Sequence, residues 1–126
     1  MVNINYRDSR PFYEQIKANI IKLITSGGLE PNSKLPSVRE LAAELAMNPN
    51  TVQRAYRELE AEGYIYKITG RGTFVTDEIP ENSPKKAELL KLFDDTVEEL
   101  LFLAIKKDEL KKRIDDIEQK NVHKHE

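Results

Sequence analysis

Cysteine and tryptophan are absent from this chain of 126 residues, and histidine occurs only twice. Without cysteine, the chain can form no disulfide and no thiolate metal site. The two histidines, His123 and His125, flank Lys124 in a polar C-terminal segment of the kind that usually frays. We therefore expect no metal site and no cofactor.

Long apolar runs are missing as well. Hydrophobic residues make up 39% of the chain and charged residues 33%, and no apolar run approaches the roughly 18 residues that suggest a membrane span. Residues 1–8 lack the basic and then apolar pattern of a secretory signal. These absences predict a cytoplasmic protein without a membrane contact.

Recognisable catalytic groups are equally scarce. No glycine-rich phosphate loop follows a predicted strand, and no paired carboxylates mark an evident pocket. A chain of 126 residues also leaves little room for a buried catalytic cleft. The chain is therefore not expected to be an enzyme.

The sequence has no excess of positive charge. Residues 1–78 carry ten Lys or Arg and ten Asp or Glu, and residues 79–126 carry ten and twelve, so the formal net charge is −2. Because Lys and Arg drive phosphate binding, this total does not favour a nucleic-acid partner. A neutral first half can still bind DNA if its basic residues share one face.

Two short amphipathic helices follow a longer one in the first half of the chain. The first is predicted from residue 11 to about 25, and residues 29–36 then read as a turn and a short extended stretch. The second helix opens with a capping box, in which Ser37 and Glu40 satisfy backbone N–H groups. The third opens at the cap Asn48 and Pro49 and runs to about residue 62.

The third helix has an apolar stripe and an opposite polar face. Val52, Tyr56 and Leu59 lie on the apolar stripe, which places Asn50, Arg54 and Arg57 opposite and Gln53 at the edge. Asn and Gln can pair with adenine and Arg with guanine. The polar face of this helix is therefore suited to base edges.

A hairpin is predicted after the third helix. Residues 64–68 and 73–76 are β-branched and aromatic runs around Thr69-Gly70-Arg71-Gly72. Two helices joined by a short turn and followed by a hairpin indicate a winged helix-turn-helix, in which the second helix of the pair enters the major groove. The expected fold class is mainly α with a small β-hairpin wing.

The ordered motifs at residues 35–42, 50–56, 59–63 and 70–75 resemble those of the GntR family. The resemblance covers roughly residues 11–76. Within that family, the short tail resembles the YtrA-like branch, whose members lack the larger effector-binding domains of other branches. Pro49 departs from branches that place a basic residue there, so their base contacts do not transfer to this position.

The resemblance implies a set of DNA-contacting residues on two helices and on the hairpin tip. With Arg57 added from the polar helix face, this set is Arg39, Asn50, Thr51, Gln53, Arg54, Arg57, Gly70, Arg71, Gly72 and Thr73. Two alternatives stay open from the residues alone. Arg54 and Glu58 can form a surface ion pair at spacing i, i+4, and Arg39 can be an ordinary surface residue.

A helical tail is expected after a linker and helix start at residues 81–84. Its apolar residues fall on two helices that are separated by a break near residues 105–107: Leu89, Leu92, Phe93, Val97, Leu100, Leu101, Leu110, Ile114 and Ile117. Because two such helices cannot bury both stripes against each other, we expect them to form a dimer interface. The alternative is that they pack back on the N-terminal domain.

These inferences predict a DNA-binding domain over residues 1–77 and a dimerisation tail over residues 78–126. The expected function is that of a sequence-specific transcription regulator, a repressor that binds a palindromic operator as a homodimer. Resemblance to YtrA-like regulators implies control of transporter genes. The alternative is a winged-helix module that binds proteins. The motifs identify no small-molecule effector.

Overall fold

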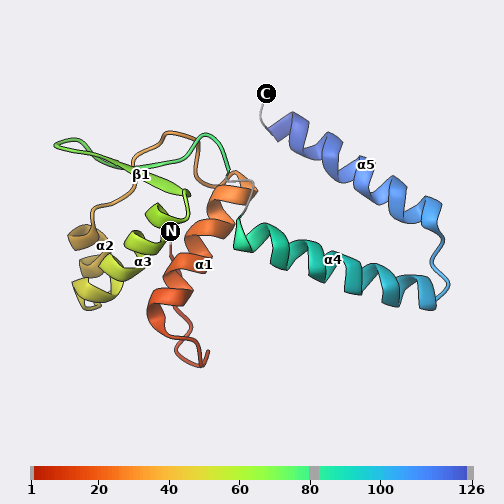
Figure 1. Ribbon diagram of the computed structural model, residues 1–126, viewed down its shortest axis with the longest axis horizontal. Helices are drawn as coiled ribbons and strands as arrows, with labels where there is room; N and C mark the ends of the chain where they lie inside the picture. Colours follow the sequence, from red (N-terminus) through yellow and green to blue (C-terminus); the bar gives the residue numbers. More distant parts are fainter. Residues whose placement is uncertain (1, 80–82, 125–126) are drawn as a thin grey trace. The chain divides into compact units, whose positions relative to one another are not determined.

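The computed structural model describes residues 2–79 and 83–124 and consists of two compact units, Met1–Ser83 and Pro84–Glu126. Glu81 and Asn82 of the expected linker, and His125, lie outside the described residues. The first unit holds three helices and a hairpin, and the second holds two helices (Figure 1). In order, these elements are α1 Phe12–Ser26, α2 Val38–Glu44, α3 Pro49–Ala61, β1 Ile65–Ile68, β2 Gly72–Val75, α4 Pro84–Phe102 and α5 Lys107–Lys124.

Both short helices begin at the caps that the sequence predicts. The Ser37 hydroxyl accepts a hydrogen bond from the Glu40 backbone N–H, 3.1 Å away, and the Asn48 side chain accepts one from the Asn50 backbone N–H at 2.9 Å. Pro49 occupies the first position of α3, where a helix has no need of its missing N–H. The N-terminal ends of the two helices are therefore set by local sequence.

The core of the first unit lies between α1, α2, α3 and the hairpin. The predicted apolar stripe of α3 is fully buried, and Ile16 and Ile20 of α1 and Leu41 of α2 have no exposed surface. Tyr56 is buried too, and its hydroxyl donates a 2.8 Å hydrogen bond to the Pro36 carbonyl. Burial is the main cause that raises the pKa of the Tyr56 hydroxyl, and the carboxylates of Glu40 and Glu44 in α2 raise it by a smaller amount. The unit thus has its own core.

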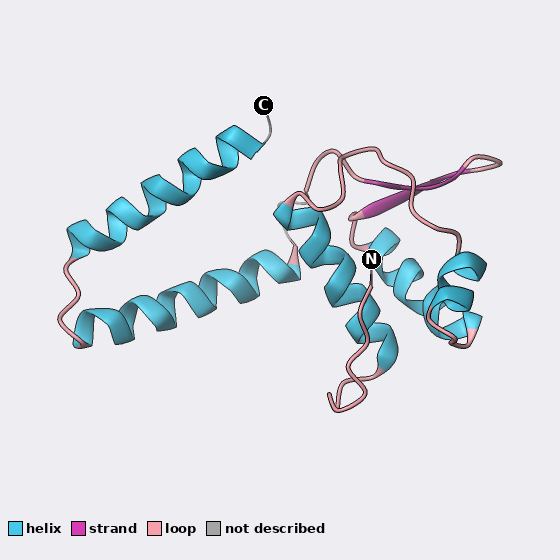
Figure 2. Cartoon of the chain, turned by 180° about the vertical axis from the view of Figure 1, so that it is seen from behind, coloured by secondary structure: helices cyan, strands magenta, loops and turns pink. Residues whose placement is uncertain are grey.

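The hairpin carries a third extended segment on its outer edge. β1 and β2 pair antiparallel, with Tyr66 opposite Phe74, and their rings stack at 5.7 Å between centroids. On the other side of β2, Lys34 forms an antiparallel bridge with Phe74, and the Leu35 backbone N–H donates to the Thr73 carbonyl at 2.8 Å. The extended stretch predicted within residues 29–36 therefore pairs with β2 through an isolated bridge, outside the two strands that Figure 2 shows in magenta.

Along the chain, the first compact unit ends at Ser83 and the second begins at Pro84. The boundary expected from the sequence lies after Asp77. Ser83 is buried in the first unit, and its hydroxyl shares a hydrogen bond with that of Tyr64. This contact is formed by two residues far apart in sequence, so no local pattern could indicate it. It extends the first unit beyond the hairpin.

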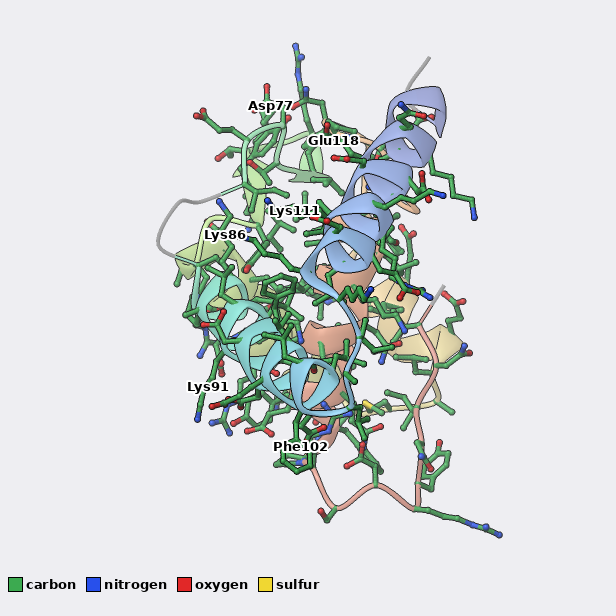
Figure 3. All side chains as sticks on the ribbon, turned by 90° about the vertical axis from the view of Figure 1, so that its right-hand side faces the viewer. Asp77, Lys86, Lys91, Phe102, Lys111 and Glu118 are labelled. Carbon is green, nitrogen blue, oxygen red and sulfur yellow. The ribbon has the colours of Figure 1, made fainter. Side chains whose placement is uncertain are left out.

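The tail consists of two helices that expose most of their apolar side chains. No residue of α4 is buried, and the ring of Phe102, at the C-terminal end of that helix in Figure 3, is 90% exposed. The break predicted near residues 105–107 is a turn in which Ala104 has a φ of 68°. Within the described residues, no helix is long and apolar enough to cross a membrane.

Candidate nucleic-acid interface

The helix-turn-helix presents a group of exposed polar and basic side chains. Arg39 is the second residue of α2, and Asn50, Gln53 and Arg57 follow one another along α3; all four side chains are exposed, and Thr51 is half-buried. Across the described residues, the side chains of these five form no hydrogen bond or ion pair within the chain, although the Asn50 backbone N–H donates to the cap Asn48. They are therefore available to an external ligand.

Arg39 stands beside a small apolar surface at the start of α3. Ala43, Ala46 and Pro49 line a shallow groove together with the Arg39 side chain. Ala46 in the turn between the two helices has a φ of 51°, and the Met47 backbone N–H closes the turn by donating to the Ala42 carbonyl at 2.9 Å. The turn thus brings the first residues of α2 and α3 to one surface.

The wing tip is built on two glycines with positive φ. The Arg71 backbone N–H donates to the Ile68 carbonyl at 2.9 Å. Gly70, which lies between them, has a φ of 79°, a value that residues with a side chain rarely adopt. Arg71 and Gly70 are exposed, and Gly72 and Thr73 are half-buried. In Figure 1 the tip lies on the same side of the first unit as α2, away from α1.

Lys34 joins the wing, although sequence reasoning assigned it no role. A Cβ atom placed on Gly72 would lie 2.7 Å from Lys34 Cε and 3.6 Å from its ammonium nitrogen, so the Lys34 side chain runs across this glycine. Lys34 is exposed. A second cationic side chain therefore lies against Gly72, the residue that follows Arg71. No local pattern could indicate it, because the pairing of Lys34 with β2 is long-range.

Arg54 differs from the other predicted contact residues. Its guanidinium donates from Nε to Glu58 Oε2 at 3.3 Å and lies over the Tyr13 ring of α1, 3.7 Å from the ring centroid. The ion pair considered as an alternative from the sequence is therefore present. Within the part of the chain that the structure describes, the side chains of its neighbours Asn50 and Arg57 on the same helix face have no such partners.

A lysine of α1 forms ion pairs with two acidic residues at the C-terminal end of α3, one in the helix and one at its C-cap. The Lys17 ammonium lies 3.2 Å from Glu58 Oε1 and also forms an ion pair with Glu62. Burial on its own would lower the pKa of Lys17, but its hydrogen bonds with these two carboxylates raise that pKa above the usual range. The positive and negative side chains of the first half are therefore unevenly distributed. Glu58 and Glu62 are paired with Lys17 of α1.

The residues predicted to form a dimer interface lie on α4 and α5. Val97, Leu100 and Leu110 are half-buried, and the other six are between 45% and 60% exposed. These are Leu89, Leu92, Phe93, Leu101, Ile114 and Ile117. The two helices leave these side chains largely uncovered within one chain.

Comparison with known proteins places this architecture among regulators. The family described as bacterial regulatory proteins, gntR family, matches residues 12–75. The chain is 49% identical over 77 residues to the HTH-type transcriptional repressor YtrA of Bacillus subtilis (strain 168), a match that covers 61% of this chain and 59% of that relative. The chain thus spans somewhat over half the length of this relative.

Two solved structures extend the comparison. A transcriptional regulator from Oenococcus oeni is 34% identical with a TM-score of 0.63, and the match covers 93% of this chain and 98% of that one. AraR(DBD) in complex with an operator is 29% identical with a TM-score of 0.51, and the match covers 60% of this chain and 93% of that one. The first confirms the predicted fold class across both units.

The family match begins at the first residue of α1 and ends at the last residue of β2. It therefore includes all three helices of the first unit and the hairpin. Half of the chain is matched, and the motifs that suggested the resemblance lie inside the matched range or at its edge. These relatives are regulators, as expected, and not enzymes. The chain belongs to the GntR family of bacterial regulatory proteins.

Proposed function

We propose that this protein is a sequence-specific DNA-binding transcription regulator that represses its target genes as a homodimer on a palindromic operator. One observation carries the proposal: the exposed side chains of Arg39, Asn50, Gln53 and Arg57 have no partner inside the described part of the chain. In a helix-turn-helix, polar side chains at the N-terminal end of the second helix, which is α3 here, contact base edges in the major groove.

Each element of the first unit has a distinct part in the proposed complex. Asn50, Thr51 and Gln53 read base edges, and Arg57 and Arg39 add contacts along the same groove. The wing places Arg71, with Gly70, Gly72 and Thr73, against a phosphate or the minor groove. Lys34 adds a second phosphate contact at the wing, because its side chain lies across Gly72.

Two relatives support the DNA-binding role and the direction of regulation. YtrA of Bacillus subtilis is named a transcriptional repressor, and AraR(DBD) was solved in complex with an operator. Resemblance to YtrA-like regulators extends the proposal to transporter genes as targets. A module that binds only proteins would not need exposed cations on the wing in addition to the exposed polar side chains of α3.

The homodimer is proposed from the tail. Leu92 and Ile117 are each 60% exposed, and Phe93 is 49% exposed, so one chain leaves a large apolar surface in water. Burial of such surface is the main driving force of association. A two-fold dimer also matches the two half-sites of a palindrome.

The phosphate contacts predict a salt dependence that can be measured. For the wild-type protein, the logarithm of the association constant should fall with the logarithm of salt concentration, with a slope of about −0.9 per phosphate neutralised. Arg71→Ala and Lys34→Ala should each make this slope shallower by about one unit. Fluorescence titration of a duplex selected from a randomised pool measures it.

Lys22→Ala serves as the matched control, since Lys22 is exposed on α1 outside both groups of proposed contacts. It should leave the slope unchanged. A wild-type affinity that does not respond to salt would contradict DNA binding and favour a protein-binding module. A normal slope in Lys34→Ala would remove that residue from the interface.

A further inference from the structure

Arg54 occupies the face of α3 that carries Asn50 and Arg57, yet it is drawn toward α1. Its guanidinium lies 3.7 Å from the centroid of the Tyr13 ring, within the range of a cation–π contact. The same group donates to Glu58 Oε2 at 3.3 Å. Both the planar face and one donor of the guanidinium are therefore engaged inside the protein.

Glu58 links this contact to a second cation. Its Oε2 accepts from Arg54, and its Oε1 accepts from the Lys17 ammonium at 3.2 Å. Lys17 also pairs with Glu62, the C-cap residue of α3. Two residues of α1, two of α3 and the C-cap residue of α3 thus form a continuous chain of contacts between these helices.

We propose that Arg54 is a positioning residue, which holds α3 against α1 through Tyr13 and Glu58 and so sets the angle at which Asn50 and Gln53 meet DNA, without touching the DNA itself. This inference rests on the proposed function and changes the role that the resemblance implies for Arg54. Arg suits this task because its planar group stacks on a ring and donates sideways at once, whereas an ammonium group cannot do both.

Three roles for Arg54 predict different results in the selected duplex. A phosphate contact would make the salt slope shallower by about one unit when it is removed, and Lys would largely preserve it. A base-reading contact would relax the preference at one base pair. A positioning role lowers affinity but leaves the salt slope and the base preference unchanged.

The experiment compares Arg54→Ala and Arg54→Lys with two changes at Tyr13. We expect Arg54→Ala, Arg54→Lys and Tyr13→Leu each to weaken binding by about four- to tenfold. Tyr13→Phe, which keeps the ring, should bind like wild type. Adding Arg54→Ala to Tyr13→Leu should cost little more, because both changes remove the same contact.

Denaturant unfolding of the same variants provides a readout without DNA. The losses of stability in Arg54→Ala and Tyr13→Leu should be non-additive in the double variant. A shallower salt slope, a relaxed base preference, or full binding by Arg54→Lys would overturn the positioning role, as would additive losses. If the wild-type protein selects no sequence from the pool, the proposed function fails, and the unfolding cycle still decides whether the contact with Tyr13 couples the two helices.

Discussion

Removal of the tail after Ser83 should reduce affinity for a full operator by about 10²- to 10⁴-fold, while the remaining unit stays folded. Two half-sites held by one dimer benefit from a high effective concentration that separate monomers lack. The core of the first unit is made of its own residues, so its melting transition should persist. Titration of a full operator and of a single half-site measures the two affinities.

Ser83 must be retained in this truncation, because its side chain is buried and its hydroxyl is bonded to that of Tyr64. A cut after Asp77 would remove this contact and confuse loss of folding with loss of dimerisation. The matched control is the half-site, to which the truncated and full-length proteins should bind equally. A truncated protein that remains dimeric would move the interface to the first unit.

Charged replacements in the full-length protein test the same interface without deletion. Phe93→Asp together with Val97→Asp should yield monomers at micromolar concentration, because a buried unpaired carboxylate strongly opposes association. A control, Lys91→Asp, changes a charge on the polar side of the same helix. Light scattering distinguishes the species, and a wild-type protein that is monomeric at high concentration would assign the tail to another partner.

Gln53→Ala and Arg39→Ala should each weaken operator binding by about 5- to 150-fold, the equivalent of one lost base or phosphate contact of about 1–3 kcal/mol. Neither residue belongs to the hydrophobic core, so the melting temperature and the dimer mass should not change. Gel shift and thermal melting provide both readouts.

Glu60→Gln is the control for these two changes, because Glu60 is exposed near the C-terminal end of α3 and its replacement has nearly the same size. It should retain operator affinity and sequence preference. Wild-type affinity in Gln53→Ala or in Arg39→Ala would remove that side chain from the DNA surface.

Local signals were sufficient to predict the helices and the hairpin. Ser37 and Asn48 are side chains that satisfy nearby backbone N–H groups, so each marks a helix start within a few residues. The period of Val52, Tyr56 and Leu59 identified the buried side of α3 because these residues face one core. The polar face opposite this stripe followed from the same geometry.

Contacts between distant residues could not be predicted in this way. Gln15 is polar and yet buried. Its burial is tolerated because its side chain accepts a hydrogen bond from the Asn5 backbone N–H at 2.9 Å and donates one to the Arg10 carbonyl at 3.1 Å. The position of Lys34 depends on pairing with β2. Arg54 has the right helical angle to face DNA, but Tyr13 of another helix redirects its guanidinium. Helical periodicity places a Cα and does not decide between partners of a long side chain.

Recovery of bound genomic fragments, followed by sequencing, tests the central claim most directly. Full-length protein incubated with fragmented DNA from its own genome should enrich a small number of sites that share one inverted repeat, with half-sites about one helical turn apart. These sites should lie upstream of the genes that the protein represses. Uniform recovery of fragments without a shared repeat would contradict sequence-specific operator binding.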